Sequence, residues 1–160
     1  MKAFAVILVV LVLVAVATVG VLYFSAKIEV RFVSCIATDG ITQVEFFEDL
    51  KEKVESSAFD GTRFSDVPLL TADQYQFLTY TVRLDNHAFL PAQTIEIRIT
   101  PMEGDLLQLG DTNCYDLASG KHTELSATIL TSRNMHSVRE ATVSYYCWGI
   151  PFTEKITLGR

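Results

Sequence analysis

The sequence predicts a mainly β protein, in which an antiparallel β-sandwich with one amphipathic helix follows a single N-terminal transmembrane helix. Three observations support this fold class. Residues 4–24 form an apolar run without a charged residue, and residues 43–56 place apolar side chains at helical spacing. About seven short segments alternate apolar with polar residues between turn signals, which is typical of a sandwich.

The apolar run at residues 4–24 has the length of a membrane span. A helix rises about 1.5 Å per residue, so the run would extend about 31 Å and match the hydrocarbon core of a bilayer. The alternative is a cleaved signal peptide, because Ala15-Val16-Ala17 fits the small-x-small pattern of a cleavage site. Apolar residues continue past that site to Phe24, which favours an uncleaved anchor at residues 1–26 followed by one domain at residues 27–160.

The orientation of this anchor rests on features outside the run. Basic residues nearly balance across it, with Lys2 before it and Lys27 and Arg31 after it, so the positive-inside rule gives little preference. The N-terminal tail is very short, and the three cysteines lack the CxxC spacing of a metal site. We therefore expect a single-pass protein of the cell membrane with its C-terminal domain outside.

The charge of the domain restricts its partners. The chain has 13 Lys and Arg against 19 Asp and Glu, and of these only Lys2 precedes the domain. An acidic surface argues against binding nucleic acid, whose phosphates require basic residues. The expected partners are the lipid bilayer, through residues 4–24, and a protein of the cell envelope. The sequence lacks a Pro-rich or Gly/Ser-rich linker, so the domain should begin almost directly at the membrane.

The first element of the domain is a predicted strand at residues 27–37, which ends at Asp39-Gly40. Its apolar residues with the same expected face are Ile28, Val30, Phe32 and Ile36.

The amphipathic helix at residues 43–56 has a predicted start signal. Thr42 and Glu45 have the spacing of a capping box, and Ile41 and Phe46 have that of a hydrophobic staple. The side chains expected to face the domain are Val44, Phe47, Leu50 and Val54. The opposite face is charged, and we interpret it as a solvated surface.

Residues 57–74 are predicted as a loop with at most a short helical turn, because they contain turn residues and no sustained period. The strands expected after it cover residues 76–85, 95–99, 106–109, 122–131, 138–148 and 152–158.

The three cysteines permit one disulfide. We favour Cys114 with Cys147, since the loop before one strand and the end of another can meet at one end of a sandwich. The alternative is three reduced, buried thiols. Cys35, if unpaired, is either a core residue or an intermolecular link.

The other polar residues give no catalytic, cofactor or metal site. His87, His122 and His136 stand in or beside separate predicted turns without a second ligand at metal-site spacing, so we interpret them as surface residues. Glu96 and Arg98 are expected to form cross-strand ion pairs.

Aspartates at turns are expected to cap backbone N–H groups, and these are Asp85, Asp105 and Asp111. The motifs GxSxG, HExxH, GxxxxGK[ST] and GxGxxG are absent from the sequence. Tyr146 and Trp148 alternate with the inward residues of their strand, so they could form an exposed binding patch or could pack beneath the helix.

Two segments resemble known families. Tyr145-Tyr146-Cys147 resembles the tyrosine corner and cysteine of immunoglobulin strand F. Residues 76–158 resemble the bacterial membrane-anchored FxLYD and LEA-like sandwich proteins, whose roles are largely unassigned. The features that carry this resemblance are Leu84-Asp85-Asn86, Pro91, the strand Ile95 to Ile99, and Leu117-Ala118-Ser119-Gly120 before Leu125 to Ile129. The resemblance implies an immunoglobulin- or fibronectin-like fold.

These features lead to one preferred function and two alternatives. The preferred hypothesis is a membrane-anchored extracytoplasmic interaction module of the bacterial cell envelope, without catalytic activity. The first alternative is a pilin-like subunit of a surface filament, which also joins an apolar N-terminal helix to a β domain. The second is an envelope hydrolase, which would require a pocket with clustered catalytic groups.

Overall fold

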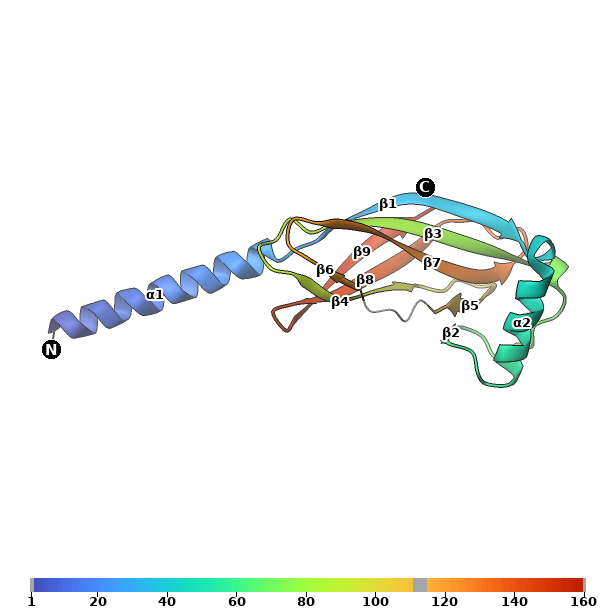
Figure 1. Cartoon of the computed structure of the whole chain (residues 1–160), viewed down its shortest axis with the longest axis horizontal. Coiled ribbons are helices and arrows are strands. Elements are labelled where there is room, and N and C mark those ends of the chain that lie inside the picture. The colour runs from blue at the N-terminus through green and yellow to red at the C-terminus, as the bar shows by residue number, and fades with distance from the viewer. Residues whose placement is uncertain (1, 111–114, 160) are drawn as a thin grey trace.

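The N-terminal helix projects from one end of an elongated β domain (Figure 1). The structure is a computed structural model that describes residues 2–110 and 115–159. Helix α1 spans Lys2–Ser25, as the apolar run predicts. We call the end of the domain next to α1 the proximal end; it contains residues 86–91 and the turn at Trp148-Gly149. The opposite, distal end contains residues 40–74, 100–104 and 133–138.

The domain consists of two antiparallel sheets, which confirms the mainly β prediction. The first sheet has the order β1-β3-β7-β5-β2. Its strands are β1 (Glu29–Asp39), β3 (Tyr75–Asp85), β7 (His122–Ser132), β5 (Asp105–Leu109) and β2 (Gly61–Arg63). The second sheet has the order β6-β4-β8-β9. Its strands are β6 (Tyr115–Leu117), β4 (Ala92–Ile99), β8 (Arg139–Cys147) and β9 (Ile150–Leu158). The short strands β2 and β6 lie in segments that were predicted as loops.

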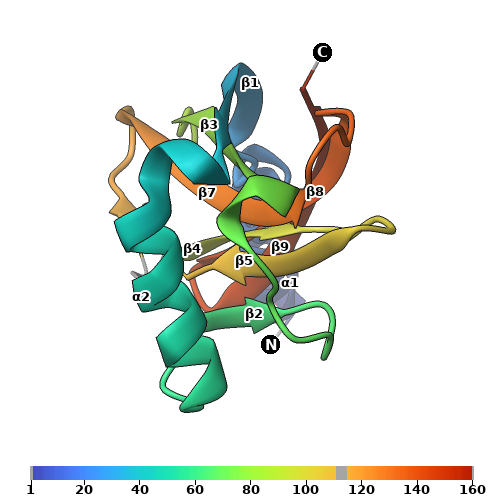
Figure 2. The ribbon, with the colours of Figure 1, turned by 90° about the vertical axis from the view of Figure 1, so that its right-hand side faces the viewer.

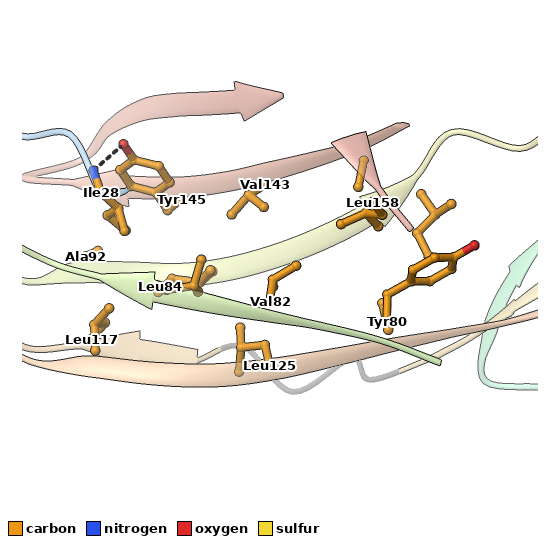
Figure 3. Packing of buried hydrophobic residues seen from close by; sticks show 14 of the residues in the cluster. Ile28, Tyr80, Val82, Leu84, Ala92, Leu117, Leu125, Val143, Tyr145 and Leu158 are labelled. Atoms are coloured by element: carbon orange, nitrogen blue, oxygen red, sulfur yellow. Dashed lines mark hydrogen bonds between the residues drawn. The ribbon is translucent and has the colours of Figure 1, made fainter. Parts of the chain in front are cut away.

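The main hydrophobic core lies between the two sheets. Val82 and Leu84 of the first sheet point into the same layer as Val143 and Tyr145 of the second (Figure 3). The alternation predicted for residues 76–85 is confirmed, because Leu78, Tyr80, Val82 and Leu84 are buried. Each large apolar side chain buried in this way stabilises the fold by about 1.5–3 kcal/mol relative to an exposed one.

A second core fills the distal end, where helix α2 (Val44–Glu55) lies across the first sheet (Figure 2). As predicted, Phe47, Leu50 and Val54 face inward. Their buried neighbours are Leu69, Ala72, Tyr75, Phe77, Leu106, Leu107 and Leu130. Two 3-10 turns, Gly40–Gln43 and Ala72–Gln74, flank these segments.

The predicted start of α2 is wrong. The 3-10 turn draws Thr42 into a helical position, and its hydroxyl donates to the Asp39 carbonyl at 2.6 Å instead of accepting an N–H of α2. Gln43 is the N-cap residue and makes no side-chain capping bond. Val44 was also expected to face the domain but is exposed, while the Phe46 ring packs on the Phe77 ring with centroids 5.4 Å apart.

The face predicted for Ile36 is also wrong. The register of β1 against β3 shifts between Phe32 and Ser34, so Val33 is the extra residue of a β-bulge. One extra residue inverts the alternation of side chains after it. Cys35 therefore packs against the main core, whereas Ile36 is 60% exposed.

Candidate functional site

An open groove lies at the distal end, between residues 64–70 and the β4–β5 turn. Its volume is about 500 Å³, and side chains from β7 and from residues 74–75 complete its lining. Its apolar rim includes Val67, Leu70 and Met102, all of which are exposed. Gln74, Glu103 and Ser132 supply polar groups to the lining. A concave apolar site with a few polar groups has the general character of a binding site.

One wall of the groove is held by a buried ion pair that joins the two sheets. Arg139 on β8 donates through Nε and Nη2 to the two carboxylate oxygens of Asp105 on β5, each at 2.8 Å. Both side chains have no exposed surface. Asp105 Oδ2 also accepts the Met102 N–H at 2.9 Å, so the pair fixes the β4–β5 turn that carries Met102.

The environment of Asp105 favours its ionised form. Burial alone would raise the pKa of this carboxyl, but hydrogen bonds from Arg139, from the Met102 backbone and from Thr131 outweigh burial and lower the pKa. Burial opposes the charge of Arg139 as well, and Asp105 more than compensates, so the pKa of Arg139 is raised. Both groups are therefore charged at neutral pH.

The opposite wall of the groove is tied to its surroundings through backbone groups of Leu70. The Leu70 N–H donates to the Tyr75 hydroxyl at 3.2 Å, and the Lys51 ammonium of α2 donates to the Leu70 carbonyl at 3.1 Å. The groove is therefore a preformed feature with both walls anchored to regular structure.

The proximal end holds the predicted patch residues Tyr146 and Trp148. Both are exposed, Trp148 at 64%, and α2 lies at the other end of the domain, so the alternative that they pack beneath that helix is wrong. Trp148 and Gly149 form the two-residue turn between β8 and β9, with φ of 53° and 74°. Positive φ at both positions is the geometry of a type I′ hairpin, and Trp148 occupies its tip.

The disulfide prediction is untested because Cys114 lies outside the described residues. Cys147 is buried, and its Sγ lies 3.6 Å from the Ala26 carbonyl oxygen. Cys35 is a half-buried free thiol against the main core. Burial raises the pKa of both thiols.

The three histidines do not converge. His87 lies in the β3–β4 connection and His122 begins β7 opposite Asp85, whereas His136 lies in the β7–β8 connection at the other end of these strands. His87 Nε2 is 3.4 Å from a carboxylate oxygen of Glu29. Across residues 2–110 and 115–159, the side chains include no group of three His, Cys, Asp or Glu that could hold a metal ion.

The other polar predictions have mixed outcomes. Glu96 and Arg98 pair with each other at 3.0 Å along β4, not with another strand. Asp85 pairs with Arg83 instead of capping a turn, and buried Asn86 holds the β3–β4 connection by donating to the Leu90 and Leu117 carbonyls at 3.0 Å.

Asp105 caps the Met102 N–H as predicted, and its pairing with Arg139 is an additional role that the sequence analysis missed. Asp111 lies outside the described residues. The groove was missed too, because its walls come from segments far apart in the chain. The comparisons identify no family: no family model, no curated protein and no solved structure matches this chain.

Proposed function

We propose that the protein is a single-pass membrane protein whose domain serves outside the membrane as an interaction module and not as a catalyst. The observation that carries this proposal is the exposure of α1. Residues 4–19 are all exposed, and the helix has an apolar surface on every side over Phe4–Ser25. A helix that is apolar all round and has no protein cover is suited to lipid.

The joint between α1 and the domain supports a fixed orientation of the module. Ala26 and Ile28 are buried in the main core immediately after the helix. The Ile28 N–H donates to the Tyr145 hydroxyl at 3.0 Å (Figure 3). The Tyr145 ring stacks on the Phe152 ring. The Phe152 ring also packs against the Tyr23 ring of α1, with ring centroids 5.5 Å apart. Because the helix passes into the core without an unpacked segment, the distal groove should be held away from the bilayer.

We further propose an immunoglobulin-like topology for the domain. In the order of neighbouring strands within each sheet, β1-β3-β7-β5 corresponds to strands A-B-E-D, and β4-β8-β9 corresponds to C-F-G. This correspondence supports the resemblance of Tyr145-Tyr146-Cys147 to strand F, because these residues end β8.

The distal groove is the proposed binding site for a protein partner, and photo-crosslinking in intact cells tests it. A photoreactive amino acid replaces Val67 or Leu70 on the groove rim. Ile36 is the matched control. Its side chain is 60% exposed, close to the 57% of Val67, but it lies on the outer face of β1 and away from the groove. We expect one discrete crosslinked product from the rim positions, and its loss when Met102→Asp is added. Equal products from Ile36, or no product from either rim position, would contradict the proposal.

A further inference from the structure

Apolar side chains in the proximal loops lie beside α1 and not beyond its end. Phe89 in the β3–β4 connection is 77% exposed and Trp148 at the β8–β9 tip is 64% exposed. An open groove of about 440 Å³ is lined by Phe89 together with residues of α1, namely Val14, Ala17, Thr18, Val21 and Leu22. The domain therefore reaches back along the apolar helix.

A second groove shows the same overlap on the hairpin side. Trp148, Ile150 and Leu90 line it together with Val19, Leu22 and Tyr23 of α1. Two separate loops, far apart in sequence, thus flank residues 14–23 of the helix, which make about three turns.

This overlap conflicts with a domain that stands clear of the membrane. The loops flank α1 from Val14 to Tyr23, so if they stayed in water only residues 4–13 would remain to cross the hydrocarbon. That segment is about 15 Å long at about 1.5 Å per residue, whereas the hydrocarbon core is about 30 Å thick. The shortfall of about 15 Å is removed if the loops enter the same leaflet as the end of α1.

We propose that Phe89 and Trp148 insert at the headgroup–acyl boundary of the bilayer and form a second lipid contact beside α1. The inference rests on the proposed membrane anchor and adds the surface by which the domain meets lipid. Lipid is the occupant because this apolar surface is continuous with the helix that crosses the same bilayer. Trp is enriched at that depth because its ring is amphipathic, and the hairpin tip carries it farthest from the sheet.

Trp148 provides the probe, because it is the only Trp in the chain. The full-length protein is reconstituted in phosphatidylcholine vesicles and separated by flotation. The fluorescence of Trp148 is then measured with two quenchers, phosphatidylcholine brominated near the top of the acyl chain and aqueous iodide. We expect strong quenching by the brominated lipid and iodide quenching at least about two-fold weaker than at a water-exposed site.

A matched control moves the probe to the opposite end of the domain. In Trp148→Phe/Val67→Trp the Trp lies on the distal rim, and we expect iodide quenching with no effect of the brominated lipid. In Phe89→Asp we expect normal flotation with weaker quenching of Trp148 by the brominated lipid, because the charged side chain no longer inserts beside Trp148.

The outcomes separate the anchor from the second contact. Failure of the protein to float with vesicles overturns the proposed anchor. Normal flotation with Trp148 open to iodide and insensitive to brominated lipid overturns only the lipid contact. Trp148 shielded from both quenchers also overturns it, since a protein surface would then cover the hairpin. If Phe89→Asp leaves lipid quenching unchanged, the assignment of Phe89 is wrong.

Discussion

Replacing Asp105 with alanine would leave the Arg139 guanidinium buried between the sheets without its counterion. Arg139 Nε and Nη2 lose two charge-assisted hydrogen bonds of 2.8 Å, and neither side chain has exposed surface through which water could replace them. Removing one partner of a buried ion pair costs about 3–5 kcal/mol, because the remaining charge is uncompensated. Domains of this size are stable by about 5–15 kcal/mol, so Asp105→Ala should remove a large part of the total.

Urea unfolding of the full chain in detergent, followed by circular dichroism of the β domain, measures this loss. We expect a lower midpoint with an unchanged m-value. The matched control is Asp105→Leu/Arg139→Met, which removes both charges and should recover most of the stability lost in Asp105→Ala. A loss below about 1 kcal/mol in Asp105→Ala, or no recovery in the double variant, would show that Arg139 does not depend on Asp105 as its counterion.

Three further predictions concern pH, the joint and the thiols. Because the folded pKa of Asp105 is lowered, its contribution to stability is complete above the unfolded pKa of about 4 and is lost as pH falls through the folded value. Urea midpoints from pH 6 to pH 2 should show this loss, and Asp105→Asn should show less of it. Tyr145→Phe removes the acceptor of the buried Ile28 N–H and should cost about 1–3 kcal/mol in the same urea assay, whereas Tyr146→Phe on the exposed neighbour should have little effect. If Cys114 pairs with Cys147, mass mapping of the protein alkylated without reductant should recover one linked peptide and alkyl label on Cys35 alone, and label on all three cysteines would contradict the pairing.

The strands could be predicted wherever the two faces of a strand differ. Residues 76–85 and 138–148 alternate strongly, because one face meets the main core and the other does not, and β3 and β8 follow them closely. The bulge at Val33 has no such signal. Its presence depends on the partner strand, and it decides whether Cys35 or Ile36 faces the core.

The buried ion pair had one signal in the sequence. Arg139 has the same phase as the inward residues Ala141, Val143 and Tyr145 of β8, and a basic residue at an inward position requires a partner. The identity of that partner could not be predicted, because Asp105 lies 34 residues earlier in the chain and is expected there as a turn residue. The groove and the overlap of Phe89 with α1 could not be predicted either, because each is formed by segments that lie far apart in the chain.

We propose that residues 4–24 cross a bilayer once, with the domain outside. An impermeant amine-reactive label applied to intact cells, with peptide mass mapping of the protein recovered from carbonate-washed membranes, tests it most directly. We expect the protein to stay in the washed membranes, Lys51 and Lys53 of α2 to be labelled in intact cells, and Lys2 to be labelled only after permeabilisation. Release by carbonate, or labelling of Lys2 but not of Lys51 and Lys53 in intact cells, would contradict it.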